Sequence, residues 1–171
     1  MSQPQNHPAS RSPEQLLVEC DVRRVRRSGP GGQHRNKVET GVVLVHRPTG
    51  VKAEANERRS QAENRAVALQ RLRVNLALEV RRSGRLDLDP SPLWRSRCRG
   101  GRIGISRSHD DFPAVLAEAL DVVADKGAEV KDAAAVLGCS ASQLIKLLKQ
   151  EPRAMVLVNG WRAERELHPL R

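Results

Sequence analysis

Aromatic residues are almost absent from this chain of 171 residues, which has no Tyr, one Phe and two Trp. Proteins that grip single-stranded nucleic acid by base stacking need rings on a sheet or in a groove, so the composition argues against a stacking platform. Cysteine is scarce too. Cys20, Cys98 and Cys139 are odd in number and share no CxxC spacing, which argues against a disulfide framework or a zinc knuckle.

Long apolar runs are also missing. No segment approaches the length of a membrane span, and the start MSQPQNHPASRSPEQ lacks the apolar segment of a signal peptide. Positive charge is abundant: 30 Lys and Arg oppose 20 Asp and Glu, giving a net charge of +10 and a pI near 10.7. We therefore expect a cytoplasmic protein with no membrane contact, whose partner is a polyanion, nucleic acid before membrane.

The first half of the sequence predicts a compact α+β domain over residues 13–80, after a disordered lead at 1–12. Apolar and polar residues alternate over 17–25, which predicts a half-buried strand. TGVVLVH (40–46) and VKAEA (51–55) predict two more strands, joined into a hairpin by the turn RPTG.

A helical period follows from residue 60. Ser60 and Glu63 fit a capping box at the helix start. The expected apolar stripe contains Ala62, Ala66, Leu69, Leu72 (or Arg73) and Leu76. One helix covering a small mixed sheet completes the predicted domain.

Residues 81–109 are rich in Gly, Ser, Pro and Arg and show no sustained period, which predicts a basic linker. A plain tether is one interpretation. Because arginine greatly outnumbers Asp87 and Asp89, we favour an arm that follows phosphates.

Residues 110–171 predict a small all-helical unit. Asp111 can cap a helix that has Pro113 in its first turn and stops at Gly127. A further helix ending at Gly138 and another capped by Ser140 read as a helix-turn-helix, with a plain small bundle as the alternative. In the second of these helices Gln143, Lys146 and Lys149 lie on the side away from the leucines.

The stretch SGPGGQHRNK, residues 28–37, carries the most specific signal. Glycine lets backbone approach a ligand closely, so Gly31 and Gly32 can expose the N–H of Gln33 as a donor to a developing oxyanion. The Gln33 side chain does not titrate near neutral pH and cannot act as a general base. Chemistry at this loop therefore depends on positioning and charge stabilisation.

Over residues 17–76 the chain resembles the catalytic domain of class I peptide chain release factors and of the related hydrolases that rescue stalled ribosomes. The resemblance lies in the SG-x-GGQ loop with His34 and Asn36, the PTG hairpin, and the helix pattern that includes Ser60 and Asn64. These elements occur in the family's order with close spacing. Arg35 departs from the family, which usually has a small apolar residue there.

The resemblance implies ribosome-dependent hydrolysis of the ester that joins a nascent peptide to tRNA. Gly31, Gly32 and Gln33 would form the catalytic tip, with the Gln33 N–H stabilising the transition state and its side chain selecting water. Expected partners are the peptidyl transferase centre, ribosomal RNA and peptidyl-tRNA; we expect a monomer with no cofactor and no metal. The candidate RNA contacts are Arg24, Arg26, Arg27, Ser28, Arg35, Asn36, Lys37, Arg58, Arg59, Arg65, Arg95, Arg97, Arg99 and Arg102.

Stop-codon reading is not expected, since the chain is short and no PxT or SPF tripeptide occurs in a suitable position. Codon-independent rescue is the leading hypothesis. One alternative is a non-catalytic protein that docks on ribosomal RNA, or that binds DNA through the helix-turn-helix. Another is hydrolysis of free peptidyl-tRNA, which lacks support because no general base accompanies Gln33.

Overall fold

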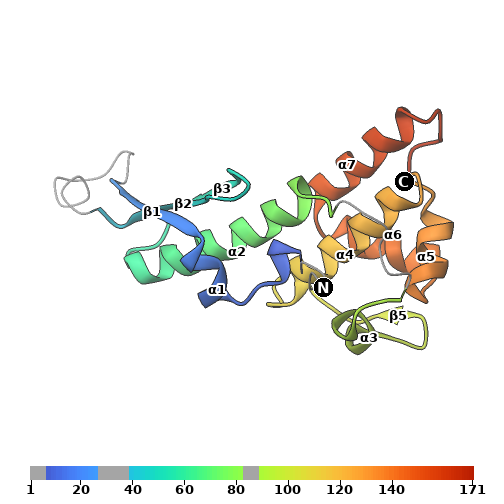
Figure 1. Ribbon diagram of the computed structural model, residues 1–171, viewed down its shortest axis with the longest axis horizontal. Helices are drawn as coiled ribbons and strands as arrows, with labels where there is room; N and C mark the ends of the chain where they lie inside the picture. Colours follow the sequence, from blue (N-terminus) through green and yellow to red (C-terminus); the bar gives the residue numbers. More distant parts are fainter. Residues whose placement is uncertain (1–6, 27–38, 83–88) are drawn as a thin grey trace, which may run out of the picture.

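A computed structural model describes residues 7–26, 39–82 and 89–171. Its N-terminal part contains a three-stranded sheet in the order β1 (Cys20–Val25), β2 (Gly41–His46), β3 (Lys52–Ala55), at the narrow end of an elongated molecule (Figure 1). Both strand pairs are antiparallel. The predicted α+β class is confirmed. The sheet is antiparallel rather than mixed, because consecutive strands pair directly and no crossover separates them.

The strand expected at 17–25 begins later than its alternation indicated. Residues Pro13–Val18 form the short helix α1, in which Ser12 and Gln15 make a reciprocal capping box. β1 therefore starts at Cys20. Val18, at the end of α1, is exposed rather than packed beneath the sheet. The helix-start signal outweighed a pattern of period two that was only nine residues long.

The β2–β3 hairpin and the helix α2 (Gln61–Glu79) form as predicted. Ser60 caps α2 through the backbone N–H of Glu63. The buried face is shifted from the expected stripe in the first two turns. Ala62 and Ala66 are exposed, whereas further along the helix the expected stripe is buried. The buried residues of α2 are Asn64, Ala68, Leu69, Leu72, Arg73, Val74, Leu76 and Ala77.

α2 also covers the outer edge of β3. Asn75 Nδ2 donates to the Lys52 carbonyl over 2.8 Å, and Arg71 Nη1 donates to the Glu54 carbonyl over 2.8 Å. An edge strand otherwise leaves such carbonyls open to another chain. These two side chains thus cover the β3 edge of the sheet and fix α2 along it.

Part of the segment expected to be a linker is folded. α3 (Pro92–Arg97) is capped by Ser91, and β4 (Cys98–Arg99) pairs with β5 (Arg102–Ile103) in a hairpin. Trp94 is 1% exposed and its Nε1 donates to the Leu137 carbonyl over 2.8 Å. Six helical residues and two short strands are too brief to show a sequence period, so the pattern gave no sign of them.

Four helices complete the fold: α4 (Phe112–Asp125), α5 (Val130–Leu137), α6 (Ala141–Lys149) and α7 (Pro152–Ala163). α5 and α6 are joined by the predicted short turn, with Gly138 at φ 68° and Ser140 capping α6 through the N–H of Gln143, as in a helix-turn-helix. Asp111 precedes α4 but makes no cap hydrogen bond, since its carboxylate pairs with Arg97.

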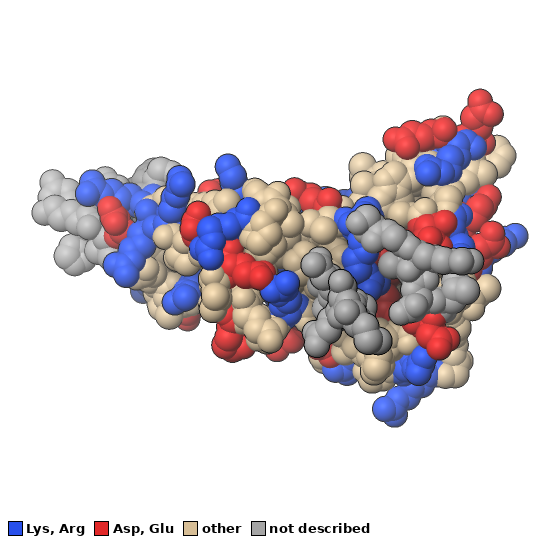
Figure 2. Space-filling model, viewed as in Figure 1, with Lys and Arg blue, Asp and Glu red and all other residues tan. Residues whose placement is uncertain are grey.

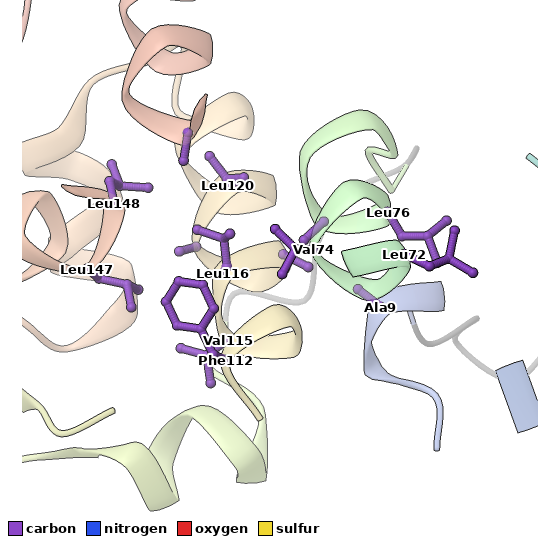
Figure 3. Packing of buried hydrophobic residues seen from close by; sticks show 14 of the residues in the cluster. Ala9, Leu72, Val74, Leu76, Phe112, Val115, Leu116, Leu120, Leu147 and Leu148 are labelled. Atoms are coloured by element: carbon purple, nitrogen blue, oxygen red, sulfur yellow. The ribbon is translucent and has the colours of Figure 1, made fainter. Parts of the chain in front are cut away.

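α2 and α4 join the sheet domain to the helical unit. Val74 of α2 lies on the side that faces Leu116 of α4 (Figure 3). The described core residues, from the sheet to α7, form one continuous apolar cluster. In the described part of the chain, no helix combines the length and apolar character that a membrane crossing requires.

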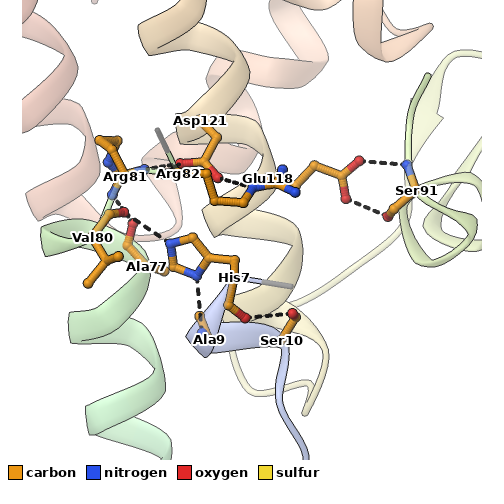
Figure 4. A network of polar contacts seen from close by, with 10 residues as sticks. All are labelled: His7, Ala9, Ser10, Ala77, Val80, Arg81, Arg82, Ser91, Glu118 and Asp121. Carbon is orange, nitrogen blue, oxygen red and sulfur yellow. Dashed lines mark hydrogen bonds and ion pairs between the residues drawn. The ribbon is translucent and has the colours of Figure 1, made fainter. Parts of the chain in front are cut away.

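A buried polar network pins the end of α2 (Figure 4). Asp121 of α4 is 3% exposed; it pairs with Arg82 at 2.7 Å and with Arg81 at 3.3 Å. His7 contacts the Val80 carbonyl through Nε2 at 3.0 Å, and its Nδ1 accepts from the N–H of Ala9. The first two arginines of the expected phosphate-tracking arm are therefore used inside the fold.

The same network orders part of the expected disordered lead. Pro8–Ser10 form a short 3-10 helix, η1, and Ala9 is fully buried against the core. Residues 1–6 lie outside the described residues.

Candidate functional site

The glycine-rich stretch connects two paired strands. Val25 ends β1, Gly41 begins β2, and the two are direct cross-strand partners. The chain therefore leaves the sheet and returns to it at the same end of this strand pair. The predicted catalytic residues Gly31, Gly32 and Gln33 lie outside the described residues. So do the predicted RNA contacts Arg27, Ser28, Arg35, Asn36 and Lys37. The structure describes the base on which this loop stands.

Gly41 lets the two strands approach closely at that base. A Cβ at this position would lie 2.6 Å from Val25 Cγ2 and 2.8 Å from the Val25 carbonyl oxygen. Backbone cannot swing away as a flexible side chain does, so any larger residue would push the strands apart. Glycine is required here by space, and its φ is not left-handed.

Asn64 ties the base of the loop to the start of α2. Its side chain is fully buried and makes three hydrogen bonds. Nδ2 donates to the Thr40 carbonyl at 2.7 Å and to the Arg58 carbonyl at 3.0 Å, while Oδ1 accepts from the Arg58 N–H at 2.9 Å. All but one of the bonding positions of the amide are thus filled. Thr40, next to the loop, and Arg58, before α2, are held together by one side chain.

Basic side chains surround this base, and Figure 2 shows Lys and Arg gathered at the narrow end of the molecule. The predicted contacts described there are all exposed: Arg24, Arg26, Arg58, Arg59 and Arg65. Arg26 pairs with Glu39 at 3.3 Å, but both side chains are largely open to solvent. Such a pair stabilises by about 0–1 kcal/mol, so a phosphate can replace the carboxylate.

The other predicted contacts lie at the opposite end of α2. Arg95 and Arg97 are in α3, and Arg99 and Arg102 are in the β4–β5 hairpin. Arg97 is engaged by Asp111 at 3.0 Å and serves the fold. α2 has 19 residues and is roughly 28 Å long at ~1.5 Å per residue, and it runs between the sheet domain and the helical unit that carry the two groups. The structure therefore divides the predicted RNA contacts into two groups.

No titratable pair suited to acid–base catalysis lies at the described base of the loop. Burial raises the pKa of Cys20 and Cys98, and raises the pKa of Cys139 to about 11, so all three remain neutral thiols. His46 is 2% exposed and hydrogen-bonds to Thr49 and Glu19 beneath the sheet. Among residues 7–26, 39–82 and 89–171, no cluster of three His, Cys, Asp or Glu side chains could hold a metal.

An open pocket of about 480 Å³ lies between β3, α2 and the start of α7, lined by Val43, Lys52, Ala53, Glu54, Arg71, Asn75, Arg107 and Arg153. Its arginines already have partners. Arg71 pairs with Glu57 at 2.6 Å. The buried Glu151 holds Arg107 at 3.0 Å and Arg153 at 2.8 Å. These cations, despite the burial that opposes ionisation, hold the pKa of Glu151 below its ordinary value. We read the pocket as a junction between the two parts of the fold.

Two residues of the loop base were not assigned a role from the sequence. In the sequence Asn64 stands out only as part of the helix pattern shared with the family, although a buried asparagine near a helix start needs backbone partners. A glycine at the start of a strand often marks close approach, which is the signal that Gly41 carried. The sequence does not show which strand would approach it.

Comparison with known proteins identifies the domain built on this base. Residues 17–87 match the RF-1 domain. The chain is 42% identical over 77 residues to peptide chain release factor 1 of Acidovorax sp. (strain JS42), covering 44% of this chain and 20% of that protein. It is 31% identical over 137 residues to the same factor of Leptospira biflexa, covering 69% of this chain and 38% of the relative.

A third relative, peptide chain release factor 1 of Geobacter metallireducens, is 35% identical over 100 residues, which cover 53% of this chain and 28% of the factor. The chain thus spans between a fifth and two fifths of the length of these three relatives. No solved structure matches it significantly. Residues 17–87 thus match the GGQ-containing domain of class I release factors.

Proposed function

We propose that this protein hydrolyses the ester bond of peptidyl-tRNA on the ribosome, without reading a stop codon. The observation that carries the proposal is the RF-1 match, which spans the loop with Gly31, Gly32 and Gln33. The described base supports it, because Asn64 and Gly41 give the loop a rigid, closely paired foundation. The relatives are named peptide chain release factor 1.

In this mechanism a water molecule attacks the carbonyl carbon of the ester. The tRNA sugar oxygen leaves with the electron pair of the broken bond and takes up a proton. The Gln33 N–H stabilises the oxyanion that develops on the carbonyl oxygen, and its side chain orients the water. Gln33 remains neutral throughout, and RNA and substrate supply the proton transfers. The partners are the ribosome and peptidyl-tRNA; the protein acts as a monomer in the cytoplasm.

Independence of the codon is proposed from the rest of the chain. These 171 residues contain neither a PxT nor an SPF tripeptide. After the RF-1 match, the described residues form α3, the β4–β5 hairpin and α4–α7. The proposed rescue activity places recognition of the stalled ribosome in this helical unit.

The test is peptide release from ribosomes stalled on a truncated message. Gln33→Pro removes the backbone donor and is expected to lower the rate by ~10²–10³-fold. Gly32→Ala is expected to slow release because it restricts the loop, and Gln33→Ala because it removes the amide. Gly160→Ala is the control, since a Cβ there meets nothing within 4 Å.

Two outcomes would contradict the proposal. Unchanged release by Gly32→Ala and Gln33→Pro would exclude the catalytic role of the loop. Release that requires a stop codon in the decoding site would exclude codon independence.

A second candidate is a non-catalytic nucleic-acid-binding protein. The observation that favours it is the α5–α6 helix-turn-helix, with its left-handed Gly138 and capped α6. Absence of peptide release by the wild-type protein, together with tight binding to duplex DNA, would support this candidate instead.

A further inference from the structure

The β4–β5 hairpin presents two exposed arginines, Arg99 and Arg102, for which the described residues provide no ion-pair partner. Arg99 and Arg102 are direct cross-strand partners, and both are exposed. Like charges placed opposite each other destabilise a strand pair. In the part of the chain that the structure describes, no ion pair engages either guanidinium. Two adjacent cations without an ion-pair partner among the described residues do not stabilise the hairpin, but they can bind an anion.

The turn between the strands has the geometry of a tight two-residue hairpin. Gly100 and Gly101 have φ values of 56° and 74°, and positive φ at both central residues is what a type I′ hairpin turn requires. A Gly104 N–H to Arg97 carbonyl hydrogen bond of 2.8 Å closes the base of the hairpin. The backbones of the two arginines are therefore paired directly across the hairpin.

The hairpin is also fixed to the helix-turn-helix. The Ile103 N–H donates to Gln143 Oε1 of α6 at 3.2 Å, and Gln150 Nε2 donates to the Ile105 carbonyl at 3.0 Å. Lys146 is three residues after Gln143 and four before Gln150, so it shares their side of α6 and lies along the same segment. Lys146 is exposed and adds a third cation on α6, next to the segment 103–105 that leaves the hairpin.

These contacts argue against reading of base sequence by α6. Glutamine recognises adenine through both ends of its amide, but Gln143 and Gln150 are already bonded to backbone. What remains exposed on this side is cationic, which suits phosphate groups in any sequence. The surface is thus built to contact a nucleic-acid backbone.

We propose that Arg99, Arg102 and Lys146 form a binding site for the phosphate backbone of structured RNA, separate from the loop on the sheet domain. The choice of RNA over DNA rests on the proposed function of the RF-1 domain. In that setting the site holds the helical unit on ribosomal RNA while the loop reaches its substrate.

The experiment measures binding of the full chain to purified ribosomes and to a short RNA hairpin, across a range of KCl concentrations. The test variant is Arg99→Gln with Arg102→Gln. The loss of two phosphate contacts is expected to reduce the slope of log affinity against log salt by about 1.4–1.8 and the affinity by about tenfold at moderate salt. Lys146→Gln is expected to give about half of that change in slope.

The control is Arg165→Gln with Arg171→Gln, which removes the same charge from exposed positions at the C-terminal end. It is expected to bind within about twofold of the wild type, because distant exposed charges are screened. All variants are expected to fold, since none of the substituted cations in the hairpin or α6 is buried; the hairpin variant should melt at the wild-type temperature or slightly above it, because it loses a pair of like charges.

Three results would overturn the inference: no binding of the wild type to ribosomes, equal binding by the hairpin variant and the control, or tighter binding to a DNA duplex of the same sequence than to RNA. Peptide release is measured in parallel. A wild type that binds RNA through the hairpin but releases no peptide refutes the proposed function and leaves the hairpin site standing.

Discussion

Replacement of Asn64 by Ala is the sharpest test of how the loop base is held. The change removes three hydrogen bonds and leaves the carbonyls of Thr40 and Arg58, and the N–H of Arg58, without their partner. A buried group left unsatisfied costs about 1–3 kcal/mol. Because Arg58 is itself exposed, its backbone regains water in part. We therefore expect a loss of about 2–4 kcal/mol in the free energy of unfolding.

Urea denaturation followed by circular dichroism measures this loss, and thermal melting is expected to fall by about 5–12 °C. Arg65→Ala, the exposed neighbour on the same helix, is the control and should change stability by no more than about 0.5 kcal/mol. Asn64→Asp should be worse than Asn64→Ala at neutral pH, because a buried carboxylate would face two carbonyl oxygens. If Asn64→Ala and Arg65→Ala have the same free energy of unfolding, the hydrogen bonds of Asn64 do not stabilise the loop base and the reasoning is wrong.

Two further predictions concern packing and pH. Gly41→Ala should lower the free energy of unfolding, measured in urea, by about 1–3 kcal/mol, because the added Cβ meets Val25. Gly160→Ala inside α7 is the control and should raise it by up to about 1 kcal/mol. Equal effects of the two substitutions would contradict the close approach of β1 and β2 at Gly41. Burial lowers the pKa of His7 below its ordinary value, despite the nearby Asp121. The unfolded chain then takes up the proton first, so stability should fall as the pH drops below about 6.5 and level off beneath the lowered pKa. The same titration on His7→Gln should lose this part of the pH dependence; an unchanged profile would contradict the assignment.

Elements with explicit turn or cap chemistry could be predicted from the sequence. The RPTG turn fixed the β2–β3 hairpin, Ser60 marked the start of α2, and Gly138 followed by Ser140 marked the helix-turn-helix. In each case one residue type satisfies a local backbone requirement that does not depend on distant parts of the chain.

Elements stabilised by distant contacts could not be predicted. α3 and its hairpin depend on Trp94 reaching Leu137, and η1 depends on His7 reaching Val80. Arginine-rich composition indicated a solvated arm, but Arg82 is bound by the buried Asp121 almost forty residues away. Composition reports how many charges a segment carries and not which of them are neutralised.

The candidate site also combines a part that local sequence predicts and a part that depends on distant contacts. The catalytic residues were assigned from an ordered local motif and stay a prediction, as do the RNA contacts. The support beneath them, from Asn64 to Thr40, joins residues 24 positions apart and became visible only in the fold.

The straight helix α2 has a consequence for how the molecule can engage a large target. One end is clamped by Asn64 beside the loop, and the other is locked through Arg82 to Asp121. Its 19 residues span roughly 28 Å, and because both ends are bonded to other elements, α2 sets the separation between the loop base and the helical unit. A large target that contacts the loop base and the helical unit at the same time must therefore present its two contact surfaces at a matching distance.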